Sequence, residues 1–220
     1  MAGLSTLILS NGGLRSLVAT AAVRSDPDAK RVSLLHLSDG RASASRSAQF
    51  VALQAAHFRI VKIHEVLLAQ QVRSGSQEAV AGDTAPDGTA PLHRPRMLLQ
   101  SLEACIELGI DRLVWPGQFD GDHEQIAAVT EQIILLEQLA QLSHEHLPTI
   151  ETPLLELTDT QVLELGSHLE VPWKLAWSCQ LHGEKPCMVC PPCRRRQQIF
   201  EHAGLADPID TRRTASSSAG

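Results

Sequence analysis

The sequence predicts an α/β protein: a parallel sheet with helices on both faces, followed by a small C-terminal module that contains four cysteines. Short apolar runs alternate with amphipathic stretches of helical length, and Gly- or Pro-containing turns separate them. Four of the five cysteines lie close together near the C-terminus. The chain has 220 residues, 43% of them hydrophobic and 20% charged, which excludes a wholly disordered protein.

The first half of the chain predicts two βαβ steps and a long loop. A turn containing Gly12 and Gly13 ends the first apolar run and opens the first helix. Residues 71–91 have no periodicity and are rich in Gly, Pro and Ser, so we expect a mobile loop or insertion there. The expected strands are 6–9, 32–37 and 60–63, and the expected helices are 14–23 and 42–58.

The second half continues the alternation. Gly109 is expected to cap the helix before it, and Thr158 with Gln161 forms a capping box that starts another helix. The polar segment 211–220 offers nothing to a core, so we expect disorder. The expected helices are 96–108, 122–143, 158–168 and 191–204, and the expected strands are 113–115 and 149–152.

Composition excludes several classes of partner. The net charge of −6 and the aromatic content of 3% argue against nucleic acid as a partner. No run approaches the roughly 18 apolar residues of a membrane span, and the N-terminus has no basic leader. We therefore expect a cytoplasmic protein with no membrane partner.

The cysteines follow the pattern C-x7-C-x2-C-x2-C, which predicts a tetrahedral metal site. Because all four ligands would be thiolates, we expect structural zinc rather than a catalytic ion, and a reducing compartment. An iron–sulfur cluster and two disulfides are the alternatives, and His182 could compete as a ligand. Arg194, Arg195 and Arg196 are expected to offset the thiolate charge. The ligands are Cys179, Cys187, Cys190 and Cys193, whereas Cys105 is expected to be a buried core thiol.

The glycine turn is the second candidate site. Glycines let a backbone approach a ligand closely, and a helix N-terminus offers unpaired N–H groups to phosphate. A tight strand-to-helix turn without a ligand explains the same residues equally well. The turn matches neither G-x-G-x-x-G nor the Walker pattern. Its residues are Ser10, Asn11, Gly12, Gly13, Leu14, Arg15 and Ser16.

Turn and cysteines together resemble the 7-cyano-7-deazaguanine synthase (QueC) family of PP-loop ATP pyrophosphatases, from about Thr6 to Pro208. The most specific segments are the run from Thr152 to Thr158, then Val171-Pro172-Trp173, and Cys187-x-x-Cys190-x-x-Cys193-Arg194. The resemblance implies a Rossmann-like fold of the adenine nucleotide alpha hydrolase type, ATP with Mg²⁺ at the turn, and structural zinc. It also implies a possible homodimer.

The resemblance further implies a reaction in queuosine biosynthesis. ATP would adenylate the carboxylate of 7-carboxy-7-deazaguanine, ammonia would form the amide, and a second ATP would drive dehydration to the nitrile. The implied partner is therefore a small-molecule deazapurine substrate. Arg96 matches an arginine that the family carries in the helix after the long loop, with Met97 where the family has asparagine.

The chain departs from the family in the loop that would bind ATP and in the motif that would bind the substrate. The family loop S-G-G-x-D-S has Asn11 in place of its first serine and Arg15 in place of its aspartate. Carboxylates suit Mg²⁺ and a guanidinium does not, although Arg15 could bind phosphate directly. The family's Asp-Cys-Arg substrate triplet is missing from residues 125–131. Three hypotheses follow: a synthase of the family type, an ATP-dependent enzyme with another substrate, and a catalytically degenerate, zinc-stabilised partner or scaffold.

The expected domain organisation has three parts. Residues 1–170 form the nucleotide-binding α/β domain, 171–208 the zinc-binding module, and 209–220 a disordered tail. Trp173 and Trp177 are expected to pack the module onto the sheet domain. Asp120, Asp122, His123 and Glu124 either replace lost metal ligands or simply start a helix, where acidic groups suit the helix dipole.

Overall fold

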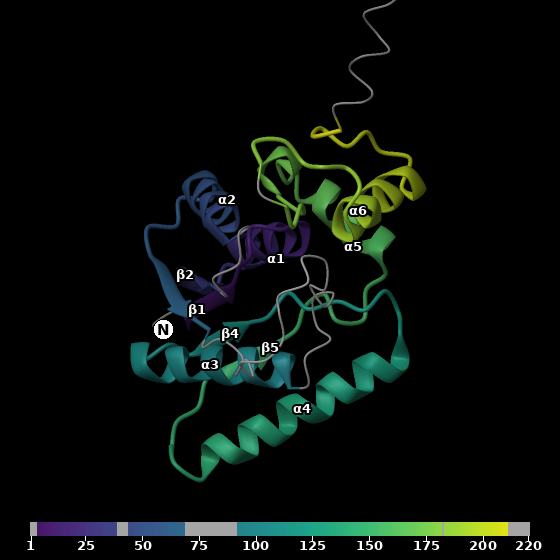
Figure 1. Cartoon of the computed structure of the whole chain (residues 1–220). Helices are drawn as coiled ribbons and strands as arrows, with labels where there is room; N and C mark the ends of the chain where they lie inside the picture. Colours follow the sequence, from purple (N-terminus) through teal and green to yellow (C-terminus); the bar gives the residue numbers. More distant parts are fainter. Residues whose placement is uncertain (1–3, 39–43, 69–91, 182, 211–220) are drawn as a thin grey trace, which may run out of the picture.

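The computed structural model describes residues 4–38, 44–68, 92–181 and 183–210, which form a five-stranded parallel sheet (Figure 1). The strand order is β3-β2-β1-β4-β5, and every neighbouring pair is parallel. The chain builds outward from β1 to β3 and then crosses back to place β4 on the other side of β1. The strands are β1 (Leu4–Leu9), β2 (Ala29–Ser38), β3 (Ile63–Leu67), β4 (Arg112–Val114) and β5 (Thr149–Glu151).

Helices cover both faces of the sheet, as predicted. Ile8 of β1 points into a core with α1 (Leu14–Ser25), α2 (Ala44–His57) and α5 (Asp159–His168). Leu7 and Leu9 point into a second core with α3 (His93–Leu108) and α4 (His123–Gln141). Because alternate residues of a strand point to opposite faces, the consecutive buried residues Leu7, Ile8 and Leu9 require cover on both sides.

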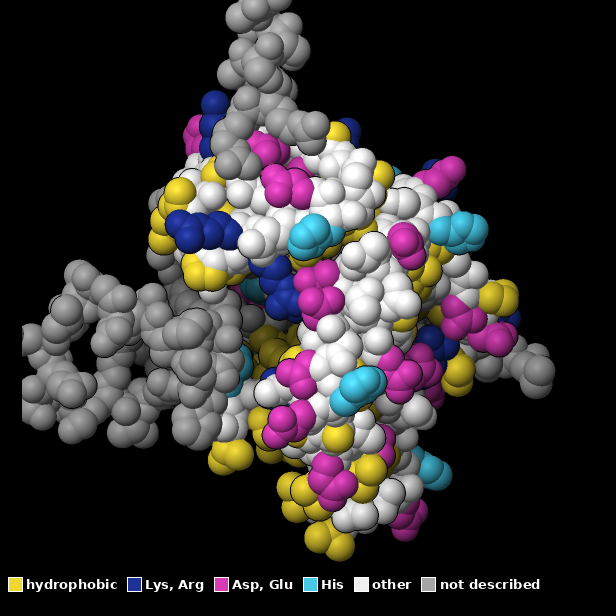
Figure 2. Space-filling model, turned by 90° about the vertical axis from the view of Figure 1, so that its right-hand side faces the viewer, with side chains coloured by type: hydrophobic (Ala, Val, Ile, Leu, Met, Phe, Trp, Pro, Cys, Tyr) yellow, Lys and Arg dark blue, Asp and Glu magenta, His cyan; other side chains and the backbone are white. Residues whose placement is uncertain are grey.

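Helix α4 is the least buried of the covering helices. Val129 and Leu136 are buried, whereas Ile134, Leu135 and Leu139 are exposed. In Figure 2, hydrophobic and acidic side chains are intermixed over the lower part of the face turned to the viewer, where α4 lies. No helix among the described residues is long and apolar enough to cross a membrane.

The third strand differs from its expected position. It was predicted at 60–63 but runs over Ile63–Leu67. Ile60 instead closes the end of α2: Arg59 adopts a left-handed φ of 55°, and the Ile60 amide donates to the Ala55 carbonyl at 2.8 Å. This is the C-terminal helix motif in which an apolar residue folds back onto the helix, so Ile60 is buried as part of a cap.

Most helix ends follow the local signals in the sequence. Gly109 ends α3 with a φ of 60°, and Thr158 with Gln161 forms the predicted capping box of α5. The Asp122 side chain accepts from the amides of Glu124 and Gln125, so it starts α4 as a cap. The expected boundaries lie within three residues of the observed ones for these helices.

The C-terminal segment consists of η1 (Trp173–Leu175), the cysteine loop and α6 (Pro191–His202). Trp173 packs edge-on against Phe200 of α6, with ring centroids 5.7 Å apart. A Cβ on Gly166 of α5 would meet the Trp173 ring, so α5 accepts this ring through a glycine. The Trp173 packing that we expected is therefore confirmed.

Arg196 connects the parts of this segment. Its guanidinium makes a two-pronged ion pair with Asp207, at 2.7 and 2.8 Å, and both side chains are almost fully buried. It also donates to the carbonyls of Ala176 and Trp173. Arg195 pairs with Asp159. The fixed partners of Arg195 and Arg196 are carboxylates and carbonyls, and the offset of thiolate charge by the arginine run stays a prediction.

We retain the module at 171–208 as a proposal, with one structural qualification. Its small apolar cluster includes Phe50 of α2 beside Trp177, Cys179 and Cys193. The module therefore completes its packing with a residue of the sheet domain. The expected loop at 71–91, His182 and the tail residues 211–220 lie outside the described residues.

Replacing Arg196 should strongly destabilise the fold. Arg196→Ala leaves the Asp207 carboxylate buried without its cation, which costs about 3–5 kcal/mol. Arg194→Ala is the matched control, because Arg194 is an exposed neighbour on the same helix and should change stability by less than about 0.5 kcal/mol. Urea unfolding at equal metal content measures both variants. Equal losses in the two variants would contradict the role given to the buried pair.

Candidate functional site

The glycine turn lies at the carboxyl edge of the sheet, where the direction of strand addition reverses. It follows β1, the central strand, and leads into α1. The segment after β4 reaches the same edge, because β1 and β4 are parallel neighbours. Open parallel sheets bind ligands at this crevice.

Two backbone amides of the turn donate hydrogen bonds to side chains of the turn itself. The Gly12 amide donates to Ser10 Oγ at 3.3 Å, and the Gly13 amide donates to Asn11 Oδ1 at 2.9 Å. Ser16 Oγ donates to the Gly13 carbonyl at 3.1 Å. Gly13 provides no side-chain cap for α1. The amides of the first helical turn, at residues 14–16, have no acceptor within the helix, and such groups at a helix N-terminus can bind an anion.

Gly12 is required by the close approach of α2. Its φ is +73°, and a Cβ would lie 2.8 Å from both the Phe50 Cβ and the Ser47 carbonyl oxygen. Packing alone accounts for this glycine, whether or not the turn binds a ligand.

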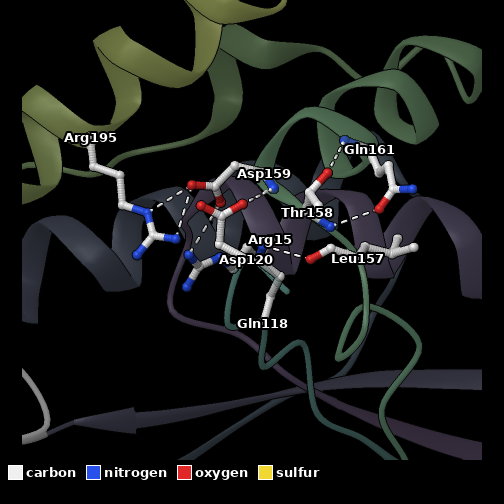
Figure 3. A network of polar contacts seen from close by, with 8 residues as sticks. All are labelled: Arg15, Gln118, Asp120, Leu157, Thr158, Asp159, Gln161 and Arg195. Atoms are coloured by element: carbon white, nitrogen blue, oxygen red, sulfur yellow. Dashed lines mark hydrogen bonds and ion pairs between the residues drawn. The ribbon is translucent and has the colours of Figure 1, made fainter. Parts of the chain in front are cut away.

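An ion-pair network surrounds Arg15 at the same edge (Figure 3). The Asp159 carboxylate lies 3.6 Å from Arg15 and receives two hydrogen-bond-length contacts from Arg195, at 2.9 and 3.0 Å. The Asp159 amide donates to the Asp120 carboxylate at 2.8 Å. Four segments therefore meet here: α1, the loop after β4, α5 and α6.

Arg15 remains a cation in this setting. Burial lowers the pKa of its guanidinium, the charge of Arg195 acts in the same direction, and Asp159 opposes both. An arginine starts from so high a pKa that it stays protonated at ordinary pH. Two guanidinium groups thus share Asp159, at the edge where phosphate would bind to a parallel sheet.

The structure brings together only part of what the sequence suggested. Residues 10–16 form one turn, whereas Arg96 lies in the first turn of α3, which covers the opposite face of the sheet from α1. Asp159 and Arg195 were not expected at this site. The local sequence carries no sign of them, because Asp159 reads as the first residue of a capped helix and lies far along the chain from Arg15.

The four cysteine sulfurs lie within 4.8 Å of one another. The Cys187 amide donates to Cys179 Sγ, and the Cys190 amide donates to Cys187 Sγ. Burial opposes ionisation of Cys187, but donors at Val189 and Cys190 outweigh it and lower its pKa to about 6. Cys105 lies apart, and burial raises its pKa to about 12, as expected for a core thiol.

The spacing of the sulfurs fits a single ion. Zinc–sulfur bonds of about 2.3 Å place the ligands of a tetrahedron about 3.8 Å apart. In a four-iron cluster each thiolate binds its own iron, so the ligating sulfurs must stand farther apart. The observed cluster is close to the mononuclear arrangement.

Gly12→Ala tests the packing of the turn. It should cost about 1–2 kcal/mol for the left-handed backbone and a further 1–3 kcal/mol, approximately, for the clash with α2. Gly109→Ala is the control, since Gly109 has a φ of +60° and open space around its Cβ position. Thermal and urea unfolding compare the two. If Gly12→Ala were no worse than Gly109→Ala, the close approach of α2 would not be what requires the glycine.

Comparison with known proteins supports the resemblance stated above. A family model described as queuosine biosynthesis protein QueC matches residues 125–204. The 7-cyano-7-deazaguanine synthase of Trichodesmium erythraeum is 35% identical over 47% of this chain and 46% of the relative. The chain thus spans about half the length of this relative. The synthase of Methanothrix thermoacetophila is 28% identical over 92% of this chain and 96% of its own.

A solved structure shares the fold. The U34-tRNA thiolase NcsA from Methanococcus maripaludis, described with its [4Fe-4S] cluster, aligns over 90% of this chain and 66% of its own. The TM-score is 0.51 and the identity 17%, so the likeness extends to the fold alone. Together with the parallel sheet and the clustered cysteines, the matches are consistent with this chain being a divergent member of the QueC family.

Proposed function

We propose that this chain carries out an ATP-dependent reaction related to that of 7-cyano-7-deazaguanine synthase, with the ATP phosphates bound at the N-terminus of α1. The observation that carries the proposal is the position of the turn. It ends the central strand at the reversal point of the sheet and leads into α1, whose second residue is Arg15. Family membership supports the same class of reaction.

In this proposal Arg15 binds phosphate directly. Guanidinium–phosphate contacts are charge-assisted and often two-pronged. Arg15 would exchange its 3.6 Å contact with Asp159 for a phosphate oxygen, while Arg195 keeps the Asp159 charge compensated. The turn itself does not fit Mg²⁺, because Arg15 is a cation and the Asn11 side chain already accepts the Gly13 amide. The proposal therefore assigns no step to a magnesium ion at the turn.

The substrate we propose is a small carboxylate related to the deazapurine of the family. The carboxylate oxygen attacks the α-phosphorus of ATP and pyrophosphate leaves. Ammonia then displaces AMP to give the amide, and a second adenylation of the amide oxygen allows AMP to leave as the nitrile forms. Recognition of the deazapurine ring would differ from that in the family, because the substrate triplet is missing from Gln125–Glu131. These residues belong to α4.

For the cysteine cluster we propose structural zinc, held by Cys179, Cys187, Cys190 and Cys193. Four thiolates leave no open coordination position, so the ion would stabilise the module without taking part in the reaction.

A second candidate function rests on the same ion-pair network. Asp159 already receives Arg15 and Arg195, and Asp120 receives the Asp159 amide. A network whose charges are matched within the chain suits a retained fold that acts as a partner or scaffold. Homodimer formation also remains a proposal.

Titration of the zinc-loaded protein with ATP, with and without Mg²⁺, separates these functions. We expect binding by the wild type and a loss of about 10- to 100-fold in Arg15→Ala, the size of a charge-assisted hydrogen bond of about 1.5–3 kcal/mol. Arg94→Ala is the control, because Arg94 lies on α3 and contacts Phe119 and Gln125. Calorimetry measures all three proteins.

Turnover is then measured as AMP and pyrophosphate release with 7-carboxy-7-deazaguanine and ammonia. No ATP binding by the wild type, with binding gained in Arg15→Asp, would overturn the enzymatic function and favour the scaffold. ATP binding without turnover of this substrate would point to a different carboxylate.

Cys190→Ser tests the metal site. The loss of one thiolate should weaken zinc binding strongly and lower the melting temperature of the protein, because binding energy at such sites is folding energy. Cys105→Ala is the control and should keep its full metal content. Elemental analysis identifies the metal. Iron together with inorganic sulfide would contradict zinc, and unchanged metal content in Cys190→Ser would contradict the four-cysteine site.

A further inference from the structure

Trp177 contacts both candidate sites. Its backbone amide donates to the Gly12 carbonyl at 2.8 Å. Its indole Nε1 donates to the carbonyl of Cys179 at 2.9 Å. A single buried residue therefore touches the glycine turn with its backbone and a metal-ligating residue with its side chain.

The indole ring is fixed from both sides. The Phe50 ring lies 5.2 Å away at an angle of 30°, and the Arg46 guanidinium lies over the ring at 5.1 Å. Arg46 also donates twice to the Gly183 carbonyl in the cysteine loop, at 2.7 and 3.1 Å. Phe50 is the residue whose Cβ approaches Gly12 most closely. The ring, the cysteine loop and the turn are thus held by the same part of α2.

A second link runs through Gln54. This fully buried side chain donates to the Leu175 carbonyl at 2.9 Å and to the Gly13 carbonyl at 3.4 Å. The segment from Leu175 to Trp177, at the end of η1 and just before the cysteines, is therefore connected to the turn at two successive glycines.

A metal in the cluster would tie Cys179 to Cys187, Cys190 and Cys193. The apolar cluster next to the cysteine sulfurs is small and consists of Trp177, Phe50 and the cysteines. Without a metal the four sulfurs have no common ligand, and because binding energy at such sites is folding energy, loss of metal would loosen the segment around Cys179. The indole hydrogen bond to the Cys179 carbonyl would then weaken, and the Trp177 backbone amide would be held less firmly against Gly12, with Phe50 and Arg46 as the remaining contacts of the ring.

We infer that Trp177 is a positioning residue that transmits metal occupancy of the cysteine cluster to the glycine turn. Metal-loaded protein presents the turn in one geometry, and metal-free protein does not. The inference rests on the proposed function only for the ligand that the turn would bind, which is a nucleoside triphosphate.

Hydrogen exchange of the full chain without nucleotide tests the coupling. Removal of zinc by a chelator should raise exchange of the hydrogen-bonded amides of Gly12, Gly13 and Leu17 by about 3- to 10-fold in the wild type, as expected for the loss of about one hydrogen bond. In Trp177→Ala the exchange should already be raised with zinc bound, and the chelator should add little. Trp177→Phe keeps an aromatic ring but lacks the N–H, so it should retain the fold and lose most of the response to the chelator.

Trp173→Phe is the control, because Trp173 packs against Phe200 and contacts neither Gly12 nor Gly13 through a described hydrogen bond. It should respond to the chelator like the wild type. Equal chelator responses in the wild type and both Trp177 variants would overturn the inference, and so would an unchanged turn in the metal-free wild type.

The exchange result is independent of the proposed function. The protein could respond to the chelator through Trp177 and yet never bind ATP. That result would support the coupling and would reject ATP as the ligand of the turn. If ATP does bind, its affinity should fall on chelation by the same factor as the change in exchange. ATP affinity that is equal with and without zinc would overturn the coupling while leaving the proposed function in place.

Discussion

The close packing around Gly12 is the constraint on which the candidate site depends. Helix α2 approaches so closely that a Cβ at this position would clash with Phe50 and with the Ser47 carbonyl. On its other side the Gly12 carbonyl accepts the Trp177 amide. A turn near the N-terminus is therefore held by a helix of the sheet domain and by the segment that leads to the cysteines. Its shape depends on residues from two distant parts of the chain.

Much of the architecture could be predicted because it depends on local sequence patterns. Apolar strand runs that alternate with helices along the chain predict a parallel sheet covered on both faces, and the two cores confirm it. Gly109 and the Thr158–Gln161 box end and start helices where expected, since caps depend on neighbouring residues. The cysteine spacing predicted the gathering of four sulfurs. Ile60 was misplaced because an apolar residue after a helix can serve either a strand or a cap.

The polar contacts that give the site its character could not be predicted, because their partners are distant in sequence. Arg15 reads as a lost metal ligand until Asp159 is found beside it, shared with Arg195. Arg196 reads as a counter-charge for thiolates until its buried pair with Asp207 is found. In both cases the fold supplies a carboxylate for the arginine. The charge reversal at Arg15 is therefore accommodated by the structure, which makes a phosphate-binding role for this residue physically reasonable.

We propose that the glycine turn binds ATP and that zinc in the cysteine cluster holds the turn in its binding geometry. The most direct test is a crystal structure of the zinc-loaded protein with ATP, using anomalous scattering to locate the metal. We expect one zinc ion among the four cysteines. The triphosphate should contact the amides of residues 14–16, and the Arg15 side chain should have left Asp159 to contact a phosphate oxygen. Nucleotide bound elsewhere, with the contact between Arg15 and Asp159 intact, would contradict it.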